Sequence, residues 1–230
     1  MATHTALVTG GNRGIGLETA RLLARRGLRV VLGVREAAAG EAAVQALKDE
    51  KLRVGMVALD VADKASVEAA VLQLARRNLR IDVLVNNAGI YPEGDALAAA
   101  DEAFEDAFRV NALGALWTSR ALLPEMLARG YGRIVNVSSG YASFARGLAG
   151  PAAYCVSKAA LNAVTLKLAQ LAHGDVKVNA VDPGWVRTRM GGPAADLTPE
   201  AAAEGVVWAA TLPAKGPNGG FFHQGKPAQW

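Results

Sequence analysis

Thr9-Gly10-Gly11-Asn12-Arg13-Gly14-Ile15-Gly16 decides the fold, because this glycine-rich stretch joins a short apolar run to a helical pattern. Glycines at such a junction permit positive φ, bring backbone N–H groups close to a pyrophosphate, and let the helix pack tightly on the strand. The spacing departs from the usual G-x-G-x-x-G, so a plain tight turn is the alternative interpretation. The residues predicted to hold a nucleotide here are Gly10, Asn12, Arg13, Gly14, Ile15 and Gly16.

Short β-branched runs alternate with longer segments rich in alanine and leucine along almost the whole chain. This rhythm is typical of βαβ units and a parallel sheet, and the nearly continuous apolar runs indicate a sheet covered on both faces. The sequence therefore predicts an α/β fold with a doubly wound parallel sheet. We expect strands over 5–9, 29–34, 54–59, 83–86, 133–137, 176–181 and 220–222, and helices over 16–26, 37–50, 63–78, 101–129, 152–173 and 199–212.

Length and composition limit the classes of protein that are possible. The 230 residues, 51% hydrophobic and 20% charged, are expected to form a single domain with a cofactor half over about 1–135 and a catalytic and substrate half over about 136–230. The longest stretch without a charged residue is 12 residues, which is too short for a membrane span. The one cysteine, Cys155, the lack of a Cys/His cluster and the lack of an export signal predict a cytoplasmic protein without a metal site.

The net charge of +4 raises the question of a nucleic-acid partner. The arginines gather at 25–29 and 76–80, where helical patterns end and where a cation is favoured by the helix dipole. Aromatic residues make up only 6% of the chain and do not interleave with the cations. We therefore expect no nucleic-acid partner.

The residues at the ends of the next strands suggest which nucleotide is bound. Enzymes that bind NAD place an acid at the end of the second strand, but Gly33-Val34-Arg35 holds none there. Arg13 and Arg35 together predict a clamp for a 2′-phosphate, and two solvent-facing arginines are the alternative. Asp60, followed by Val61, either bonds an adenine or only begins a turn. The small residues of Asn87, Ala88 and Gly89 leave room for a ligand or simply form a turn.

Tyr154 and Lys158 lie four residues apart near the start of a predicted helix, so their side chains share one face. A nearby ammonium stabilises a phenolate, and we expect Lys158 to lower the pKa of the phenol. A surface pair on a helix is the alternative. Ser138-Ser139 follows the fifth strand. Asn111, beside a glycine within the long helix, predicts a bend, and an exposed mid-helix asparagine is the alternative.

Taken in order, these motifs resemble the short-chain dehydrogenase/reductase family, and the resemblance covers essentially the whole chain. It rests on the glycine-rich turn, Asn86-Asn87-Ala88-Gly89, Asn111, Ser139, Tyr154-x-x-x-Lys158 and Pro183-Gly184. Within the family the chain resembles NADPH-dependent carbonyl reductases, through Asn12-Arg13, Arg35 and Gly184-Trp185-Val186-Arg187-Thr188.

The resemblance implies a Rossmann fold, NADPH/NADP+ as the cofactor, and reduction of a ketone or aldehyde. Tyr154 would be the general acid, Lys158 would bind the nicotinamide ribose, and Ser139 would polarise the carbonyl. Asn111 would anchor a water of a proton relay. The nicotinamide amide would be held by Pro183, Gly184, Trp185, Val186 and Thr188. A catalytically silent nucleotide-sensing or scaffold protein is the alternative, which the complete catalytic set disfavours.

The substrate and the assembly are less determined by the sequence. We expect a fairly apolar carbonyl or alcohol substrate in a pocket rimmed by Tyr141, Phe144, Leu148, Trp185 and Met190, although these side chains would equally suit a subunit interface. Only 14 residues separate Ser139 from Tyr154, whereas the monomeric carbonyl reductases carry an insertion there. A homodimer or homotetramer is therefore expected, paired through 101–129 and 152–173, with Leu168 at the interface.

Overall fold

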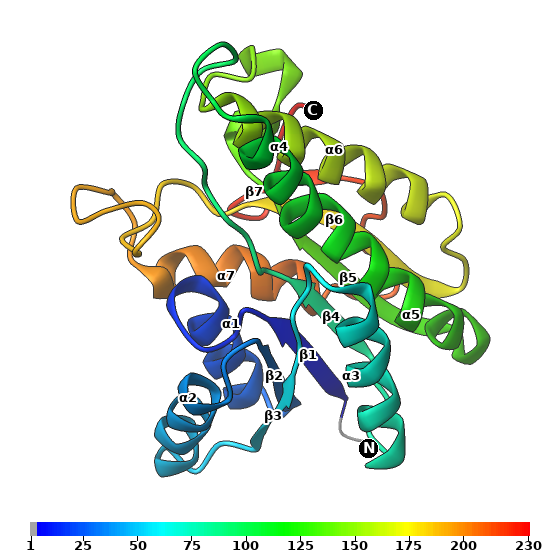
Figure 1. The fold of residues 1–230 in the computed structure, drawn as a ribbon. Helices are drawn as coiled ribbons and strands as arrows, with labels where there is room; N and C mark the ends of the chain where they lie inside the picture. The colour runs from blue at the N-terminus through cyan, green and yellow to red at the C-terminus, as the bar shows by residue number, and fades with distance from the viewer. Residues whose placement is uncertain (1–3) are drawn as a thin grey trace.

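An eight-stranded sheet with helices on both faces forms the centre of the protein, as the computed structural model shows; it describes residues 4–230 (Figure 1). The strand order is β3-β2-β1-β4-β5-β6-β7-β8, and every neighbouring pair is parallel except β7 with β8. The strand order reverses at β1, which creates a crevice at its carboxyl end. The strands are β1 (Thr5–Thr9), β2 (Arg29–Val34), β3 (Val54–Ala58), β4 (Val83–Asn86), β5 (Tyr131–Val137), β6 (Asp175–Asp182), β7 (Phe221–His223) and β8 (Lys226–Pro227).

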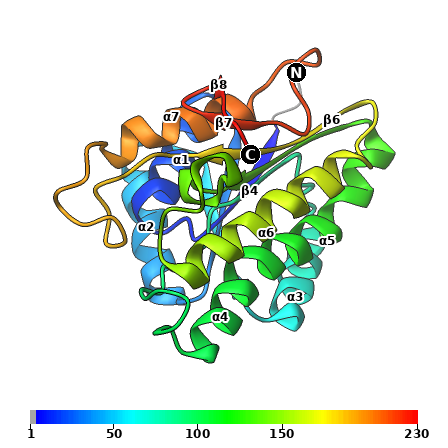
Figure 2. The same cartoon turned by 90° about the horizontal axis from the view of Figure 1, so that it is seen from above.

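Two helical layers cover the sheet (Figure 2). One face is covered by α1 (Gly14–Arg25), α2 (Ala37–Asp49) and α7 (Pro199–Ala210), and the other by α3 (Lys64–Arg76), α5 (Gly114–Arg129) and α6 (Ala152–Ala169). The shorter elements are α4 (Asp101–Ala107), the π-helix η1 (Phe108–Leu113), and two 3-10 turns, η2 (Gly140–Ala142) and η3 (Phe144–Arg146).

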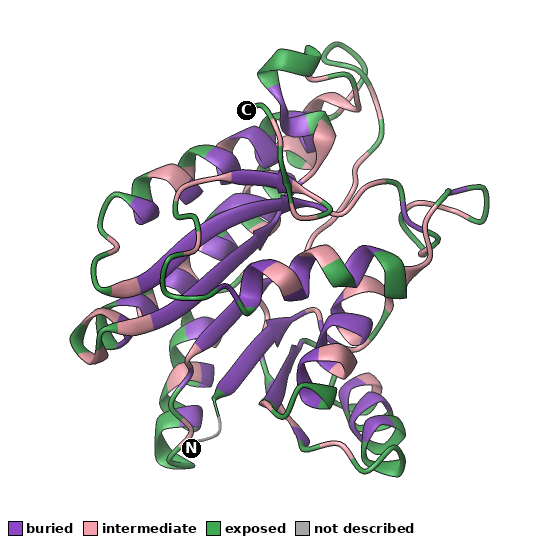
Figure 3. Cartoon of the chain, turned by 180° about the vertical axis from the view of Figure 1, so that it is seen from behind, coloured by how far each residue is buried: buried purple, intermediate pink, exposed green. Residues whose placement is uncertain are grey.

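Apolar side chains from both layers bury the sheet almost completely (Figure 3). Leu23 and Leu47 belong to the cluster under α1 and α2, and Leu74 and Met126 to the cluster under α3 and α5. Each such side chain contributes roughly 1.5–3 kcal/mol when it leaves water. The two clusters hold the strands rigidly, so that the loops at their carboxyl ends are presented from a fixed base.

The expected doubly wound α/β fold is confirmed, and all seven predicted strands are present within one or two residues at each end. The helix predicted over 101–129 is not continuous, because η1 interrupts it around Asn111, where a bend was expected. The helix predicted over 152–173 ends at Ala169, and the antiparallel strand β8 was not predicted.

Leu168 does not lie at an interface position, contrary to the expectation from the sequence. It is 5% exposed and packs in the cluster between α6 and the sheet. The apolar residues left exposed in η1, in α6 and just after α6 are Leu113, Val156 and Leu171.

Within residues 4–230 no helix has both the length and the apolar character that crossing a membrane requires. The same residues contain no group of three or more His, Cys, Asp or Glu side chains placed to hold a metal ion.

Candidate active site

The glycine-rich turn between β1 and α1 lies at the carboxyl end of the sheet. Gly10 has φ of 63°, and its N–H donates to the Gly33 carbonyl at 2.8 Å. A Cβ on Gly16 would collide with the Asn87 amide, so this position has no room for a side chain. The Asn87 Nδ2 donates to the carbonyls of Thr9 at 2.9 Å and Gly10 at 3.3 Å, which braces the turn from β4.

The first turn of α1 offers backbone donors to an anion. Among the described residues no side chain caps this turn and no acidic side chain lies in it. Its N-cap residue, Arg13, is extended and exposed, while Asn12, Gly14 and Ile15 are half-buried around it. A helix N-terminus carries partial positive charge and free N–H groups, so this donor set fits a pyrophosphate.

Arg35 follows β2 directly and is exposed. Its Nη2 lies 3.4 Å from Glu36 Oε1, and both side chains are more than two-thirds exposed, so the ion pair is weak and leaves the guanidinium open to other anions. Asp60 begins a turn, because its Oδ1 accepts the Ala62 N–H at 2.9 Å. Val61, next to it, packs its backbone on Gly114 of α5.

Tyr154, Lys158 and Ser139 come together where β5 ends and α6 begins. Tyr154 and Lys158 are both buried, and the Lys158 Nζ lies 5.9 Å from the centroid of the Tyr154 ring. The Ser139 side chain lies close enough to the Tyr154 phenol to lower its pKa, and its Oγ accepts the Tyr141 N–H at 3.2 Å. The neighbouring Ser138 instead donates to Asn162 Oδ1 at 2.6 Å in the core, so Ser139 is the serine that faces the tyrosine.

The expectation that Lys158 lowers the pKa of Tyr154 is not met. Burial raises the pKa of Tyr154, the neighbouring Ser139 hydroxyl opposes this change, and the charge of Asp182 adds to it. Burial also lowers the pKa of Lys158 to about 8, and its Nζ donates to the Val137 carbonyl at 2.7 Å. Burial removes water from both groups and so disfavours the charged form of each. For this reason the pKa of Tyr154 is raised and not lowered. The phenol is therefore held protonated, as a proton donor must be.

Asn111 closes the site from η1. Its side chain is buried and forms a pair of hydrogen bonds with the backbone of Ile90, accepting from the N–H at 2.9 Å and donating to the carbonyl at 3.0 Å. Its Nδ2 also donates to Ser157 Oγ at 3.0 Å. A Cβ on Gly89 would lie 3.1 Å from Asn111 Oδ1 and 3.5 Å from Lys158 Nζ, so these predicted residues converge on one point.

The segment after β6 reaches back to the glycine-rich turn. A Cβ on Gly14 would lie 3.2 Å from Thr188 Cγ2, which places Thr188 against the first residue of α1. Trp185 Nε1 donates to the Gly191 carbonyl at 2.8 Å and so ties the segment into a compact loop, as does the pairing of Val186 with Leu197.

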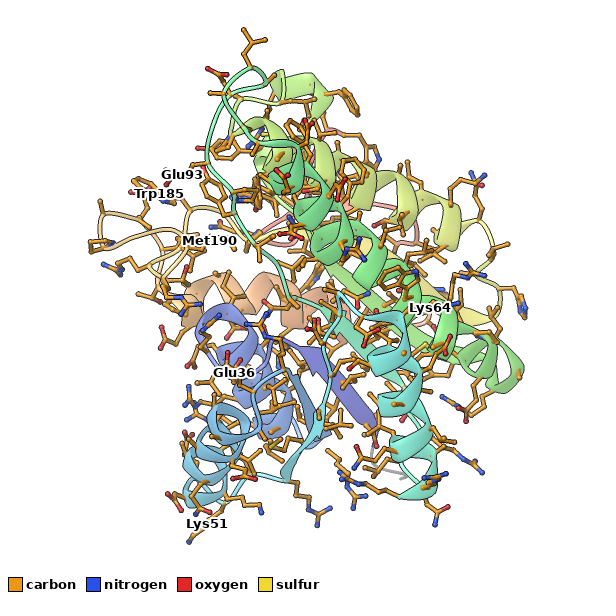
Figure 4. The ribbon with its side chains drawn as sticks, in the orientation of Figure 1. Glu36, Lys51, Lys64, Glu93, Trp185 and Met190 are labelled. Atoms are coloured by element: carbon orange, nitrogen blue, oxygen red, sulfur yellow. The ribbon has the colours of Figure 1, made fainter. Side chains whose placement is uncertain are left out.

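The predicted substrate rim is carried by two loops at the same sheet edge. Tyr141, Phe144, Trp185 and Met190 are all exposed, and Leu148 is half-buried with φ of 52°. Figure 4 shows Trp185 and Met190 on the same side of the molecule as Glu93 from the loop after β4.

Sequence reasoning missed several residues that support this site. The Thr9 hydroxyl accepts the N–H groups of Asn87 and Ala88, both at 3.0 Å. The ring of Tyr91 packs on that of Tyr154, with centroids 4.6 Å apart. The loop that carries Phe144 is held by the chain near Trp230, whose backbone O accepts the Ala145 N–H at 3.0 Å. These contacts join residues distant in sequence, and no local motif marks them.

Comparison with known proteins places this chain among the oxidoreductases. The chain matches the short chain dehydrogenase family model over residues 4–197. It is 34% identical to carbonyl reductase (NADPH) 1 of Homo sapiens, over 99% of this chain and 98% of that protein, and 39% identical to oxidoreductase UcpA of Salmonella typhimurium, over 81% and 70%.

Solved structures agree with the sequence comparison. The NADPH-bound carbonyl reductase from chicken fatty liver has a TM-score of 0.87 at 29% identity, covering 100% of both chains. A gluconate 5-dehydrogenase from Burkholderia cenocepacia, in complex with NADP and tartrate, has a TM-score of 0.87 at 28% identity, covering 97% of this chain and 94% of that one. The protein belongs to the short chain dehydrogenase family.

Proposed function

We propose that the protein is an NADPH-dependent oxidoreductase that reduces a ketone or aldehyde to an alcohol, with Tyr154 as the general acid. The observation that carries this proposal is the buried Tyr154, next to Ser139 and one turn from Lys158, at the sheet edge that also presents the glycine-rich turn. Carbonyl reduction requires a proton donor beside a bound nucleotide. Here Tyr154 and the backbone N–H groups proposed to bind the nucleotide lie at one edge of the sheet.

NADPH is the proposed cofactor because two exposed cations, Arg13 and Arg35, follow strands β1 and β2, and neither β2 nor the residue directly after it is an acid. Planar guanidinium groups suit a 2′-phosphate, whereas an acid at this strand end suits a free ribose hydroxyl. When bound, NADPH supplies the hydride that the carbonyl carbon receives. Its remaining proposed contacts are Gly10, Asn12, Gly14, Ile15, Gly16, Asp60, Val61, Asn87, Ala88, Gly89, Tyr154, Lys158, Pro183, Gly184, Trp185, Val186 and Thr188.

The side chains of this protein would carry the proton. Ser139 and the Tyr154 phenol would both donate hydrogen bonds to the substrate oxygen, and the Tyr154 proton would pass to that oxygen as charge develops on it. Lys158 would hold the nicotinamide ribose through its ammonium, and Asn111 would hold a water behind Lys158. The rim of Tyr141, Phe144, Leu148, Trp185 and Met190 supports an apolar small-molecule carbonyl as the substrate class.

Replacing Tyr154 by phenylalanine tests the proposal, because the change removes the phenol proton and keeps the buried ring. We expect Tyr154→Phe to lower kcat for NADPH-dependent ketone reduction by roughly 10²–10⁴-fold. The midpoint of thermal unfolding and the Kd for NADPH should change little. The matched control is Tyr131→Phe, at the amino end of β5, which should keep full activity. Substantial turnover in Tyr154→Phe would show that another residue is the general acid.

A further inference from the structure

One segment of the chain connects Ser139 to Tyr154. It runs over residues 139–151, from the end of β5 through η2 and η3 to the start of α6, and we call it the rim segment. The Ser139 Oγ fastens its first turn by accepting the Tyr141 N–H at 3.2 Å. The side chains of the proposed substrate rim that it carries are Tyr141, Phe144 and Leu148. Where these side chains lie relative to the proposed catalytic residues therefore depends on what holds the middle of the rim segment.

The chain that follows β8 holds the middle of the rim segment. The Ser143 hydroxyl donates to the Gln229 carbonyl at 2.9 Å, and the Ala145 N–H donates to the backbone O of Trp230 at 3.0 Å. Ser143 is 0% exposed, so water does not compete for its hydroxyl. The two hydrogen bonds lie on either side of Phe144 and fix the backbone that carries it.

Trp230 is in turn held on the sheet. Its ring stacks on that of Phe221 in β7, with centroids 5.3 Å apart and an angle of 20° between the planes. Phe221 is 3% exposed and is paired in register with Ala180 of β6. The backbone is fixed at the same place, because the Ala228 N–H donates to the Phe221 carbonyl at 2.8 Å. Stacked aromatic rings attract each other beyond the area that they bury, so Trp230 links the rim segment to the rigid sheet.

The rim side chains have little packing of their own. Phe144 is 69% exposed and Tyr141 is 44% exposed, so the backbone of the rim segment decides where they lie. A binding surface that moves must be ordered when a ligand binds, and the lost freedom weakens binding, whereas a surface that is already ordered avoids this loss. Only a substrate large enough to touch the rim is affected. Holding the rim segment in place therefore favours large apolar substrates over small ones.

We propose that Trp230 and Ser143 are positioning residues that determine specificity: they fix the rim segment on the sheet, so that large apolar carbonyl substrates bind to an ordered surface. This inference rests on the proposed function and concerns the part of the substrate that the rim contacts. Neither residue touches the reacting atoms in this account. Their effect therefore belongs in the KM for large substrates, whereas kcat depends on Tyr154 and the Kd for NADPH on the glycine-rich turn.

The test compares kcat/KM for the largest and the smallest substrates that the unmodified protein reduces, taken from a panel of aryl ketones and short aldehydes. Trp230→Ala should raise the KM for the large substrate by about tenfold, because ordering the freed rim segment costs binding free energy. Its kcat for that substrate, its kinetics with the small substrate and its Kd for NADPH should change little. Trp230→Phe keeps a ring on Phe221 and should restore most of the preference for the large substrate.

Ser143→Ala tests the same connection from the side of the rim segment. The change removes the hydrogen bond to Gln229 and should shift the substrate preference in the same direction, so it carries the test if Trp230→Ala fails to fold. Hydrogen exchange at the Ala145 amide should accelerate in both variants, and this measurement does not depend on activity.

Trp208→Ala is the matched control, because it also removes a tryptophan ring that packs on β7. The Trp208 ring lies on Phe222, with centroids 4.9 Å apart. Successive side chains of a strand point to opposite faces, so Trp208 contacts β7 from the side away from Trp230. This variant should lower the midpoint of thermal unfolding and keep the substrate preference and the slow exchange at Ala145.

Two results would overturn the inference: an unchanged substrate preference in both Trp230→Ala and Ser143→Ala, or an equal loss of preference in Trp208→Ala. Either result, in a protein whose ketone reduction still depends on Tyr154, leaves the proposed function intact. If the unmodified protein reduced no ketone or aldehyde, the proposed function and this inference would both fail.

Discussion

Lys158 shows how a single residue of the proposed site opposes the stability of the fold. Its ammonium is buried, and among residues 4–230 it has one hydrogen bond, to the Val137 carbonyl. Burial lowers its pKa to about 8 from the usual 10.5. Between these two pH values the unfolded chain binds more protons than the folded one, so the free energy of unfolding rises with pH across that window. Below pH 8 the folded protein carries the full cost of the buried charge.

We therefore expect Lys158→Met to remove a pH dependence of stability. Between pH 7 and pH 10 the free energy of unfolding of the unmodified protein should rise relative to that of the methionine variant, by about 2 kcal/mol, because one pKa unit corresponds to about 1.4 kcal/mol. Urea unfolding at each pH measures the difference. The control is Lys167→Met, at an exposed position of the same helix. Its free energy of unfolding should change with pH in the same way as that of the unmodified protein. If the free energy of unfolding of Lys158→Met changed with pH in the same way as that of the unmodified protein, the ammonium would not be destabilised by burial.

The role of a residue can be predicted from the sequence only where residues close to it in the chain form a recognisable motif. The spacing of Tyr154 and Lys158 indicates a shared helical face, and both side chains are indeed buried together. The pKa of the phenol was predicted in the wrong direction, because spacing reveals proximity and not the extent of burial. Tyr91, Thr9 and Trp230 were missed as parts of the site, since each joins it through a contact that only the folded chain creates.

The element that most affects the site is η1, the π-helix between α4 and α5. A π-turn projects one extra residue and is often found at functional sites. Here it turns the Asn111 side chain onto the backbone of Ile90 and onto Ser157 of α6. The loop after β4, which includes Tyr91, is thereby fastened to the helix that carries Tyr154.

Asn111→Leu should loosen this connection. The variant loses three side-chain hydrogen bonds and leaves the Ile90 backbone unpaired in a half-buried place, so the free energy of unfolding should fall by roughly 2–4 kcal/mol. Hydrogen exchange at the Ile90 amide should accelerate as well. The control is Arg109→Leu, at an exposed position of the same π-helix. Its free energy of unfolding should stay within about 0.5 kcal/mol of that of the unmodified protein. Unchanged exchange at Ile90 in Asn111→Leu would contradict this account of η1.

The strands were more predictable than the breaks in the helices. A buried parallel strand requires a continuous apolar run, which is visible in the sequence, as at Val83–Asn86. A bend at Asn111 was expected, but the change from α to π hydrogen bonding at Phe108–Leu113 has no such pattern in the sequence. The end of α6 at Ala169 depends on the following turn, which leads to Gly174 with φ of 63°.

At the scale of the whole molecule, we propose that copies of the chain pair through η1 and α6. The exposed apolar residues there include Leu113, at 38%, and Val156, at 40%. Leu113→Glu should lower the mass measured by sedimentation to that of a monomer, since a buried charge in a self-complementary interface is repeated in both partners. Leu168→Glu, at a core position, should unfold the chain instead. A fully active, well-folded monomer of the unmodified protein at micromolar concentration would contradict the proposed assembly.

The central claim is that this fold transfers hydride from NADPH to a carbonyl carbon. The most direct measurement uses NADPH carrying deuterium at the transferred position of C4, with a panel of apolar ketones and aldehydes, and examines the alcohol product by mass spectrometry. The account predicts one deuterium on the carbinol carbon, with NADPH preferred at least tenfold over NADH, a difference of about 1.4 kcal/mol that charge-assisted bonds to a 2′-phosphate readily provide. Failure of every ketone and aldehyde to yield deuterated alcohol would contradict it.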